Sequence, residues 1–229
     1  MEQVQLTLIL PSNLIALQLP LRSKLIKVIY ERLRVAGVFL GEVACMATAG
    51  SNHGTALVLN FDDGEGVEIA AVNDFSLVTS AVDYFALKTR ETSRTVKDQE
   101  AFYKLFIESR NDEGLNLLNV IESVLERVDT DRRSITLNHI ILNSSAPSFP
   151  LPYPVLLTTL QSIFSTSPLL CTSDYPADTQ PSSISFRSIP EFYNELKETG
   201  VEFVAWFGAT ITGKYAHADS KSFIPQKSQ

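Results

Sequence analysis

The 229-residue sequence predicts an α/β protein. Short apolar runs typical of buried strands alternate along the chain with segments whose apolar residues recur every three or four positions, as they do in amphipathic helices. Such alternation builds a sheet covered by helices. The composition agrees with this class, because 45% of the residues are hydrophobic and 20% are charged, which provides a sizeable core. At roughly 150 residues per domain, we expect one large domain or two small ones.

Two strands and two helices are predicted at the start of the chain. The apolar run at residues 5–10 is the first strand. A helix follows with Pro20 in its first turn, where a missing N–H costs nothing, and residues 37–41 are the second strand. Residues 44–49 form a helix of small side chains that Gly50 closes. The apolar face of the first helix consists of Leu21, Leu25, Val28, Ile29 and Leu33.

A β-meander is predicted next. Residues 55–61 and 67–72 are strands joined by an acidic, glycine-containing turn, and a third strand begins after Asn73 and Asp74. Residues 88–100 are dense in charge and lack an apolar period. We expect an exposed loop or a solvated helix there.

The second half of the chain predicts further helices and strands. The clearest helix spans residues 112–128, where Asp112 can cap the free N–H groups. A strand at residues 136–143 follows, and then a loop at residues 144–154. The remaining elements are a helix at 155–164, a surface loop at 165–183, a strand at 184–187, a helix at 190–198, a helix rich in small residues at 203–215 and a frayed polar tail at 217–229.

Charge and composition argue against several classes of protein. The net charge of −7 and the pI of about 5.0 argue against nucleic-acid binding, which needs a basic face. Two cysteines, Cys45 and Cys171, are too few for a disulfide framework, and we expect reduced thiols of a cytosolic protein. Prolines interrupt the apolar stretch at residues 4–21, and no basic leader precedes it. We therefore expect neither a signal peptide nor a membrane span.

The three histidines, His53, His139 and His217, lie in unrelated sequence contexts. None stands at a metal-ligand spacing from a carboxylate, a cysteine or another histidine. The sequence also contains no nucleophile elbow and no Walker phosphate loop. We therefore expect no metal site and no catalytic residue.

The turn of the meander has two interpretations. Its residues are Asp62, Asp63, Gly64, Glu65 and Gly66. Glycines between two buried strands let backbone N–H groups approach a phosphate, and an acid there can hold a metal-bound water. The same residues also make an ordinary hairpin turn.

Several segments, taken in order, resemble the actin superfamily. The helix, strand, small-residue helix and hairpin that lead to Phe75 resemble the family's approach to its second phosphate-binding hairpin. Three later segments resemble the family's Asp-x-Asp-x-Arg-Lys segment, its strand followed by Gly-Gly-Thr-Ser-Met-Phe-Pro, and its near-terminal Ala-Trp-Leu-Gly-Gly helix start. The matching segments are residues 24–33, 38–49, 56–75, 129–133, 138–150 and 205–209.

The resemblance implies a truncated actin-like, ribonuclease-H-like fold with one complete half and a two-strand remnant of the other. Residues 1–50 would be the remnant, residues 51–216 the complete half and residues 217–229 a flexible tail. The strands at residues 5–10 and 37–41 correspond to the last two of the five strands in the first half. The family's first Asp-x-Gly-x-Gly hairpin has no counterpart in the sequence.

The resemblance also places candidate nucleotide-contacting residues in the hairpin turn and in the adenosine loop. In the hairpin, either Asn60 takes the family's aspartate position and the acid is lost, or Asp62 takes it and the pattern is kept. Two family glycines are replaced by serines, which would crowd a nucleotide. We expect no resident cofactor, with ATP and Mg²⁺ as the alternative. The candidate residues are Asp62, Asp63, Gly64, Glu65, Gly66, Ser144 and Ser145.

Divergent actin-related proteins that lose nucleotide chemistry serve as assembly subunits. Residues 24–33 and 38–40 most resemble the subunits that cap the pointed end of dynactin's short actin-like filament. This resemblance implies a non-catalytic cap that binds filament subunits and small pointed-end dynactin subunits. It would act in the cytoplasm, at the cytoskeleton, and support dynein-driven transport along microtubules. The loops at residues 88–100 and 144–153 are candidate contacts. An ATPase or phosphotransferase of the same superfamily, and an actin-related subunit of a chromatin-remodelling complex, are the alternatives.

Overall fold

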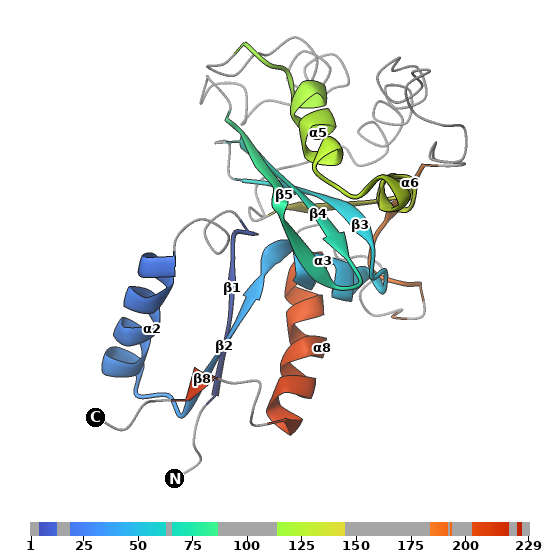
Figure 1. Ribbon diagram of the computed structural model, residues 1–229. Coiled ribbons are helices and arrows are strands. Elements are labelled where there is room, and N and C mark those ends of the chain that lie inside the picture. The colour runs from blue at the N-terminus through green and yellow to red at the C-terminus, as the bar shows by residue number, and fades with distance from the viewer. Residues whose placement is uncertain are drawn as a thin grey trace, which may run out of the picture.

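The computed structural model contains two β-sheets and five described helices longer than two turns (Figure 1). Two helices lie against the outer face of the larger sheet, two lie between the sheets, and one covers the smaller sheet. The structure describes residues 5–12, 19–62, 66–86, 114–144, 184–191, 193, 203–219 and 224–225.

The larger sheet has five strands in the order β5-β4-β3-β6-β7. The first three form the predicted antiparallel meander, and β6 and β7 run parallel to β3. In this sheet, two parallel strands extend an antiparallel meander beside its first strand. The resemblance implies this strand order for a complete ribonuclease-H-like half. The strands are β3 (Ala56–Phe61), β4 (Gly66–Asn73), β5 (Ser76–Ala86), β6 (His139–Ser144) and β7 (Ser185–Arg187).

Both faces of β3 are buried, because a helix layer covers each of them. Leu57 and Leu59 pack toward α5 (Leu117–Glu126) and α6 (Thr130–Asn138). Val58, on the opposite face, packs toward α3 (Val43–Ser51) and α8 (Val204–Ala218). Burial on both sides explains why this strand is a continuous apolar run in the sequence.

Helix α5 begins later than the sequence predicts. Its N-cap is Asn116, whose side chain accepts a hydrogen bond from the N–H of Asn119 at 2.9 Å. The Asn119 side chain accepts one from the N–H of Asn116 at 3.2 Å, which completes a reciprocal capping box. The predicted cap, Asp112, lies outside the described residues.

Helix α6 occupies the start of the strand predicted at residues 136–143. Residues 136–138 complete α6, and the strand β6 begins at His139. The hydroxyl of Thr136 donates to the carbonyl of Arg132 at 2.9 Å, one helical turn earlier. This bond satisfies the hydroxyl inside the helix, although threonine and its apolar neighbours favour a strand in the sequence.

The smaller sheet consists of β1 (Gln5–Leu10), β2 (Gly37–Glu42) and β8 (Ile224–Pro225). Strands β1 and β2 are parallel, as expected for the two-strand remnant. Strand β8 adds an antiparallel edge by pairing Ile224 with Val38. The prediction of a frayed tail from residue 217 is therefore wrong for the described residues, because residues 217–218 end α8 and residues 224–225 join a sheet. Ile224 packs on the apolar core, and its carbonyl accepts a hydrogen bond from the hydroxyl of Tyr30.

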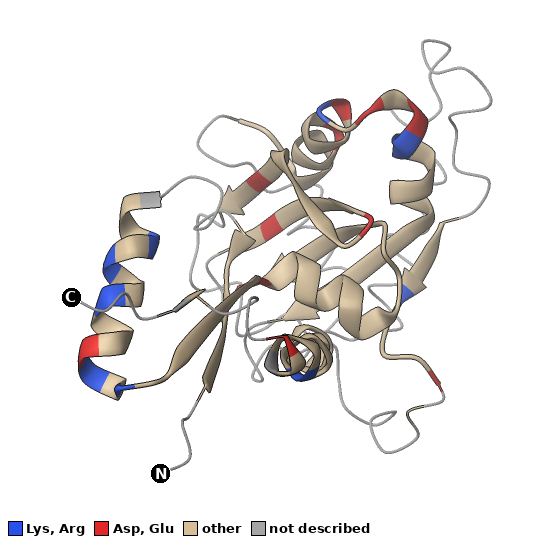
Figure 2. Ribbon diagram, turned by 60° about the horizontal axis from the view of Figure 1, so that its bottom comes forward, with Lys and Arg blue, Asp and Glu red and all other residues tan. Residues whose placement is uncertain are grey.

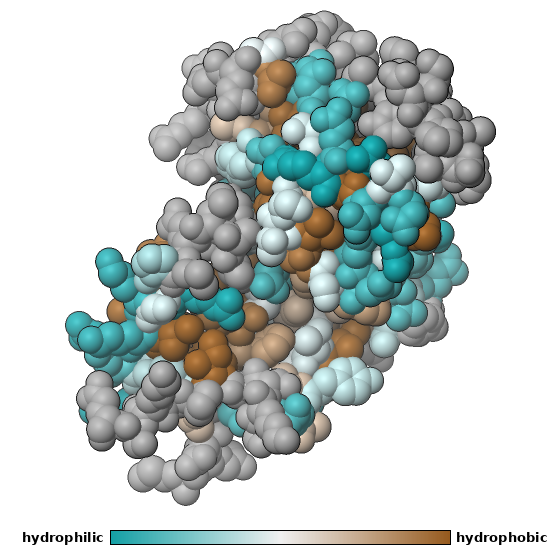
Figure 3. All heavy atoms as spheres, viewed as in Figure 1, coloured by the Kyte–Doolittle hydropathy of each residue, from teal (hydrophilic) through white to brown (hydrophobic). Residues whose placement is uncertain are grey.

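Helix α2 (Leu19–Leu33) covers the smaller sheet with only part of the predicted face. Leu25 and Ile29 pack on the core as predicted, together with Tyr30. The prediction is wrong for Leu21, Val28 and Leu33, which are exposed. Hydrophobic atoms accordingly reach the surface beside α2 and the smaller sheet (Figure 3). Basic side chains follow the helix in Figure 2. No helix in the described part of the chain is long and apolar enough to cross a membrane.

Helices α3 and α8 pack backbone against backbone. A Cβ atom added to Gly208 would lie 1.7 Å from the carbonyl oxygen of Met46. One added to Gly50 would lie 2.1 Å from the carbonyl oxygen of Val204. Both distances are far below van der Waals contact, so glycine is required at both positions for this helix separation.

Gly50 is therefore an interior contact residue of α3, and the prediction that it closes the helix is wrong. The helix continues to Ser51, and Asn52 ends it in the left-handed conformation with φ of 58°. Asparagine tolerates this conformation better than most residues with a side chain. At the other end, the hydroxyl of Ser12 accepts a hydrogen bond from the N–H of Ala44 at 3.3 Å.

We predict that Gly208→Ala lowers the free energy of unfolding by about 3 kcal/mol or more, because the new methyl group must separate α8 from α3. Gly213→Ala, in the same helix, is the matched control. Its Cβ would lie 3.1 Å from the Thr7 hydroxyl, which can rotate away, and alanine favours the helix by about 1 kcal/mol. Urea unfolding followed by circular dichroism measures both. Equal losses in the two variants would contradict the backbone contact.

Candidate functional site

The carboxyl ends of β3 and β6 hold the predicted nucleotide-contacting residues that the structure describes. The two strands are parallel neighbours with Asn60 opposite Asn143, and ligands of α/β sheets bind at such carboxyl ends. Asp62 follows β3, and its N–H donates to the carbonyl of Gly66 at 3.0 Å, which closes the turn. Asp63, Gly64, Glu65 and Ser145 lie outside the described residues, as do the loops at residues 88–100 and 145–153.

Asn143 joins the sheet to the start of α8. Its Nδ2 donates to Oδ1 of Asn60 at 2.7 Å, and its Oδ1 accepts from the backbone N–H of Ala205 at 3.1 Å. Asn60 and Asn143 are 6% and 2% exposed. A helix N-terminus at the end of a sheet is a common phosphate site because its N–H groups are free. Here one of those groups is bound by the protein itself.

Glu68 is a candidate residue that the sequence analysis missed. It stands opposite Asn60 in the β3–β4 pair and is 2% exposed. Its neighbours Ala70 and Val72 on the same face of β4 pack toward α3 and α8, so Glu68 shares that face with Asn60 and Asn143. Three polar side chains therefore lie in a row across the sheet. A single acidic residue in an otherwise apolar strand is the signal that could have found it.

The pairing of β4 with β5 explains why residue 66 is a glycine. A Cβ atom at this position would lie 2.3 Å from the carbonyl oxygen of Phe85 and 2.8 Å from the ring of Tyr84. Both residues belong to β5, which pairs with β4. This glycine is thus accounted for by the packing of the meander, which favours the hairpin interpretation of the turn at this residue.

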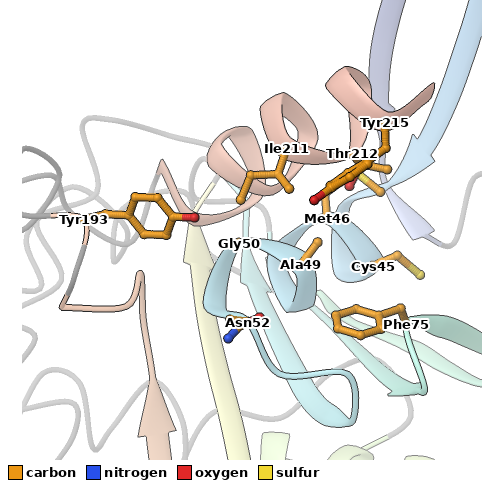
Figure 4. Close-up of a pocket in the computed structure, with 10 residues that line it drawn as sticks. All are labelled: Cys45, Met46, Ala49, Gly50, Asn52, Phe75, Tyr193, Ile211, Thr212 and Tyr215. Atoms are coloured by element: carbon orange, nitrogen blue, oxygen red, sulfur yellow. The ribbon is translucent and has the colours of Figure 1, made fainter. Parts of the chain in front are cut away.

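A cavity of about 490 Å³ opens on α3 and α8 (Figure 4). Met46 and Ile211 line it, and Tyr193 and Tyr215 lie at its opposite ends. Phe75 lies beside it on the β4–β5 turn, where a positive φ suits the tight hairpin. Tyr215 is 75% exposed and Phe75 52%. Exposed aromatic rings around an apolar hollow suit the side chains of a protein partner.

The thiol of Cys45 lines the same cavity but is no nucleophile. Burial, together with the nearby carboxylate of Glu42, raises its pKa to about 12, although a hydrogen bond with the backbone of Leu77 partly offsets this. The thiol is therefore protonated at neutral pH, and only a thiolate attacks or binds metal. Cys45 is buried and free, and Cys171 lies outside the described residues.

Two histidines that lie in unrelated sequence contexts come together in the fold. The ring centroids of His53 and His139 lie 4.6 Å apart. The parallel pairing of β3 and β6 brings them together, because His53 precedes one strand and His139 begins the other. The pKa of His139 is lowered by burial and by the charges of His53 and Arg187, against a hydrogen bond to the backbone carbonyl of Thr55 that raises it. No group of three or more metal-ligating side chains occurs among the described residues.

Comparison with known proteins identifies the fold. No protein-family model matches the sequence, and no curated protein matches it. Among solved structures, human actin-related protein Arp8 in its ATP-bound state is similar, with a TM-score of 0.66 at 12% identity over 97% of this chain. The chain spans 57% of the length of that protein's chain. The comparison therefore confirms the predicted α/β fold, a truncated form of the actin-like fold.

We predict that Asn143→Ala lowers the free energy of unfolding by about 2–4 kcal/mol, because it leaves Oδ1 of Asn60 and the N–H of Ala205 without their buried partner. Asn60→Ala should cost less, since the bond to α8 persists. The double variant should cost less than the sum of the two, because their shared hydrogen bond is lost once. Lys214→Ala, at an exposed position of α8, is the control. Strict additivity in urea unfolding would argue against the Asn60–Asn143 bond.

Proposed function

We propose that this chain is a non-catalytic, actin-like assembly subunit. The observation that carries the proposal is the hydrogen-bonded chain from Asn60 through Asn143 to the N–H of Ala205. It lies at the carboxyl ends of β3 and β6, where a nucleotide would be held in a protein of this fold.

The chemistry of these groups supports a role without hydrolysis. An ATPase needs carboxylates that hold a metal-bound water, and free donors that bind developing charge on the phosphates. Asn60 and Asn143 are neutral amides, and Asn143 occupies a donor at the start of α8. Removing these bonds to admit a phosphate would leave buried polar groups without partners, at about 1–3 kcal/mol each.

The cavity that opens on α3 and α8 supports the assembly role. Exposed aromatic residues such as Tyr215 are typical anchors of protein interfaces. We place the partner on the actin-like filament of dynactin, with this chain at the pointed end beside the small pointed-end subunits. That position follows from the resemblance of residues 24–33 and 38–40. It would put the protein in the cytoplasm, at the cytoskeleton, where dynactin supports dynein-driven transport.

Nucleotide binding is the second candidate function. The observation that favours it is the similar structure, human Arp8, which is in an ATP-bound state. In that case Asp62, at the start of the turn, would take the family's aspartate position, and a nucleotide-binding ATPase or phosphotransferase would be the activity. An actin-related subunit of a chromatin-remodelling complex is the alternative assembly role.

We predict that the purified chain binds recombinant filament subunits and small pointed-end subunits of dynactin in a binary pull-down. Tyr215→Ser should weaken binding by about tenfold or more, as expected for an aromatic anchor. Lys214→Ser, on the neighbouring exposed position of the same helix, should bind as the unaltered chain does. Recovery of chromatin-remodelling subunits from cell extract, without dynactin, would overturn the assignment to dynactin.

We also predict that the chain shows no magnesium-dependent ATP binding in the micromolar range and no ATP hydrolysis. The reason is that Asn143 occupies one donor at the start of α8, that Asn60 and Asn143 are neutral amides, and that the neighbouring carboxylate of Glu68 is only 2% exposed. A fluorescent ATP analogue, titrated with and without Mg²⁺, measures this. Micromolar binding that Asp62→Asn abolishes, while Asp83→Asn on β5 leaves it unchanged, would favour the nucleotide-binding alternative.

A further inference from the structure

Three basic side chains lie near the start of β6, away from the amide chain: His53 and His139 at its amino end, and Arg187 at the last residue of the neighbouring β7. His139 is the first residue of β6, and its ring contacts that of His53. In the parallel pairing, His139 lies opposite Ser185, and Arg187 follows two residues later on β7. Because alternate residues of a strand share a face, Arg187 lies on the same face of the sheet as His139.

Backbone carbonyls fix both imidazole rings. Nδ1 of His53 lies 2.7 Å from the carbonyl oxygen of Ser51, and Nδ1 of His139 lies 3.3 Å from that of Thr55. A carbonyl only accepts hydrogen bonds, so each Nδ1 carries the proton in these contacts. Nε2 of each neutral ring is therefore a lone pair, and protonation turns it into a second N–H donor. Both residues are half-buried, which leaves them within reach of a small solute.

Among the described residues, the side chains of His53 and Arg187 act on the pKa of His139 through their charges, and both disfavour a further positive charge. Nε of Arg187 is buried and has no hydrogen-bond acceptor among the described residues. On the neighbouring elements, Asp74 of the β4–β5 turn is 75% exposed and lies 3.5 Å from Arg132 of α6. That carboxylate is therefore directed to another cation.

We propose that His53, His139 and Arg187 form a binding site for a phosphate oxyanion, and that the site takes up protons when it is occupied. A guanidinium matches the oxygens of phosphate in a planar, two-pronged geometry, and an imidazolium N–H adds a charge-assisted bond. A metal cation would meet the positive charge of Arg187 instead. The site is independent of the amide chain at the carboxyl ends of β3 and β6.

The pH dependence follows from the fixed rings. A neutral imidazole presents its Nε2 lone pair to the anion and repels it, whereas the protonated ring donates. Anion binding therefore favours the protonated form of the imidazole rings. Affinity should rise as the pH falls through the imidazole range, by up to about tenfold per pH unit for each proton taken up.

The test is an NMR titration of the imidazole Cε1–H signals in the full chain, from about pH 5 to pH 8.5, in chloride buffer with and without about 20 mM inorganic phosphate. We expect phosphate to move the signals of both rings toward their protonated positions at pH 6, and to raise the titration midpoint of His139 by about half a pH unit or more. Sulfate, whose charge is constant over this range, should act in the same direction. A separate titration uses O-phosphoserine in place of inorganic phosphate. If O-phosphoserine binds more strongly than inorganic phosphate, the oxyanion that the site takes belongs to a phosphorylated side chain.

Variants decide whether the three residues act together. Arg187→Gln should abolish the phosphate effect on the His53 and His139 signals, and Arg187→Lys should restore part of it. His217→Gln, at the third histidine, should leave it unchanged. Circular dichroism reports whether each variant is folded. Absence of any phosphate-dependent shift at pH 6 would overturn the proposal. So would Zn²⁺ binding at pH 8 that moves both ring signals while phosphate moves neither.

Discussion

The backbone contact between α3 and α8 is the constraint on which the rest of the structure depends. Helix α3 connects β2 of the smaller sheet to β3 of the larger one, and α8 packs against both α3 and the strand β1. Gly50 and Gly208 let the two helices approach until carbonyl oxygens lie where side chains would stand. The two sheets are therefore held at a separation that a single methyl group would change, since packed interiors absorb added volume poorly.

The same contact fixes the candidate site, because Ala205 lies one helical turn from Gly208. A shift of α8 would pull its N–H away from Asn143, and with it the partner of Asn60. The end of the sheet that could hold a nucleotide is thus part of the structural framework. Two neutral amides belong to this framework, and the carboxylate of Glu68 lies in the same row on the next strand.

Local sequence patterns predicted the structure correctly where the residues of one helix or strand are sufficient to determine it. The apolar run of β1 and the meander lie where the sequence predicts them, and the resemblance identified the actin-like fold. The errors have a common cause in contacts between distant segments. Gly50 has the local pattern of a helix end, but its role depends on α8. The histidine pair and the asparagine pair each depend on the register of β3 with β6, and strand β8 has too few residues to give a periodic signal.

The order of the elements along the chain has a consequence for synthesis on the ribosome. About 150 residues separate the end of α3 from the start of α8. At about 5–20 residues per second, α3 waits roughly 8 to 30 s for its partner. During this interval the smaller sheet lacks β8 and the glycine-containing face of α3 is uncovered. The contact between Gly50 and α8 can therefore form only after nearly the whole chain has been made.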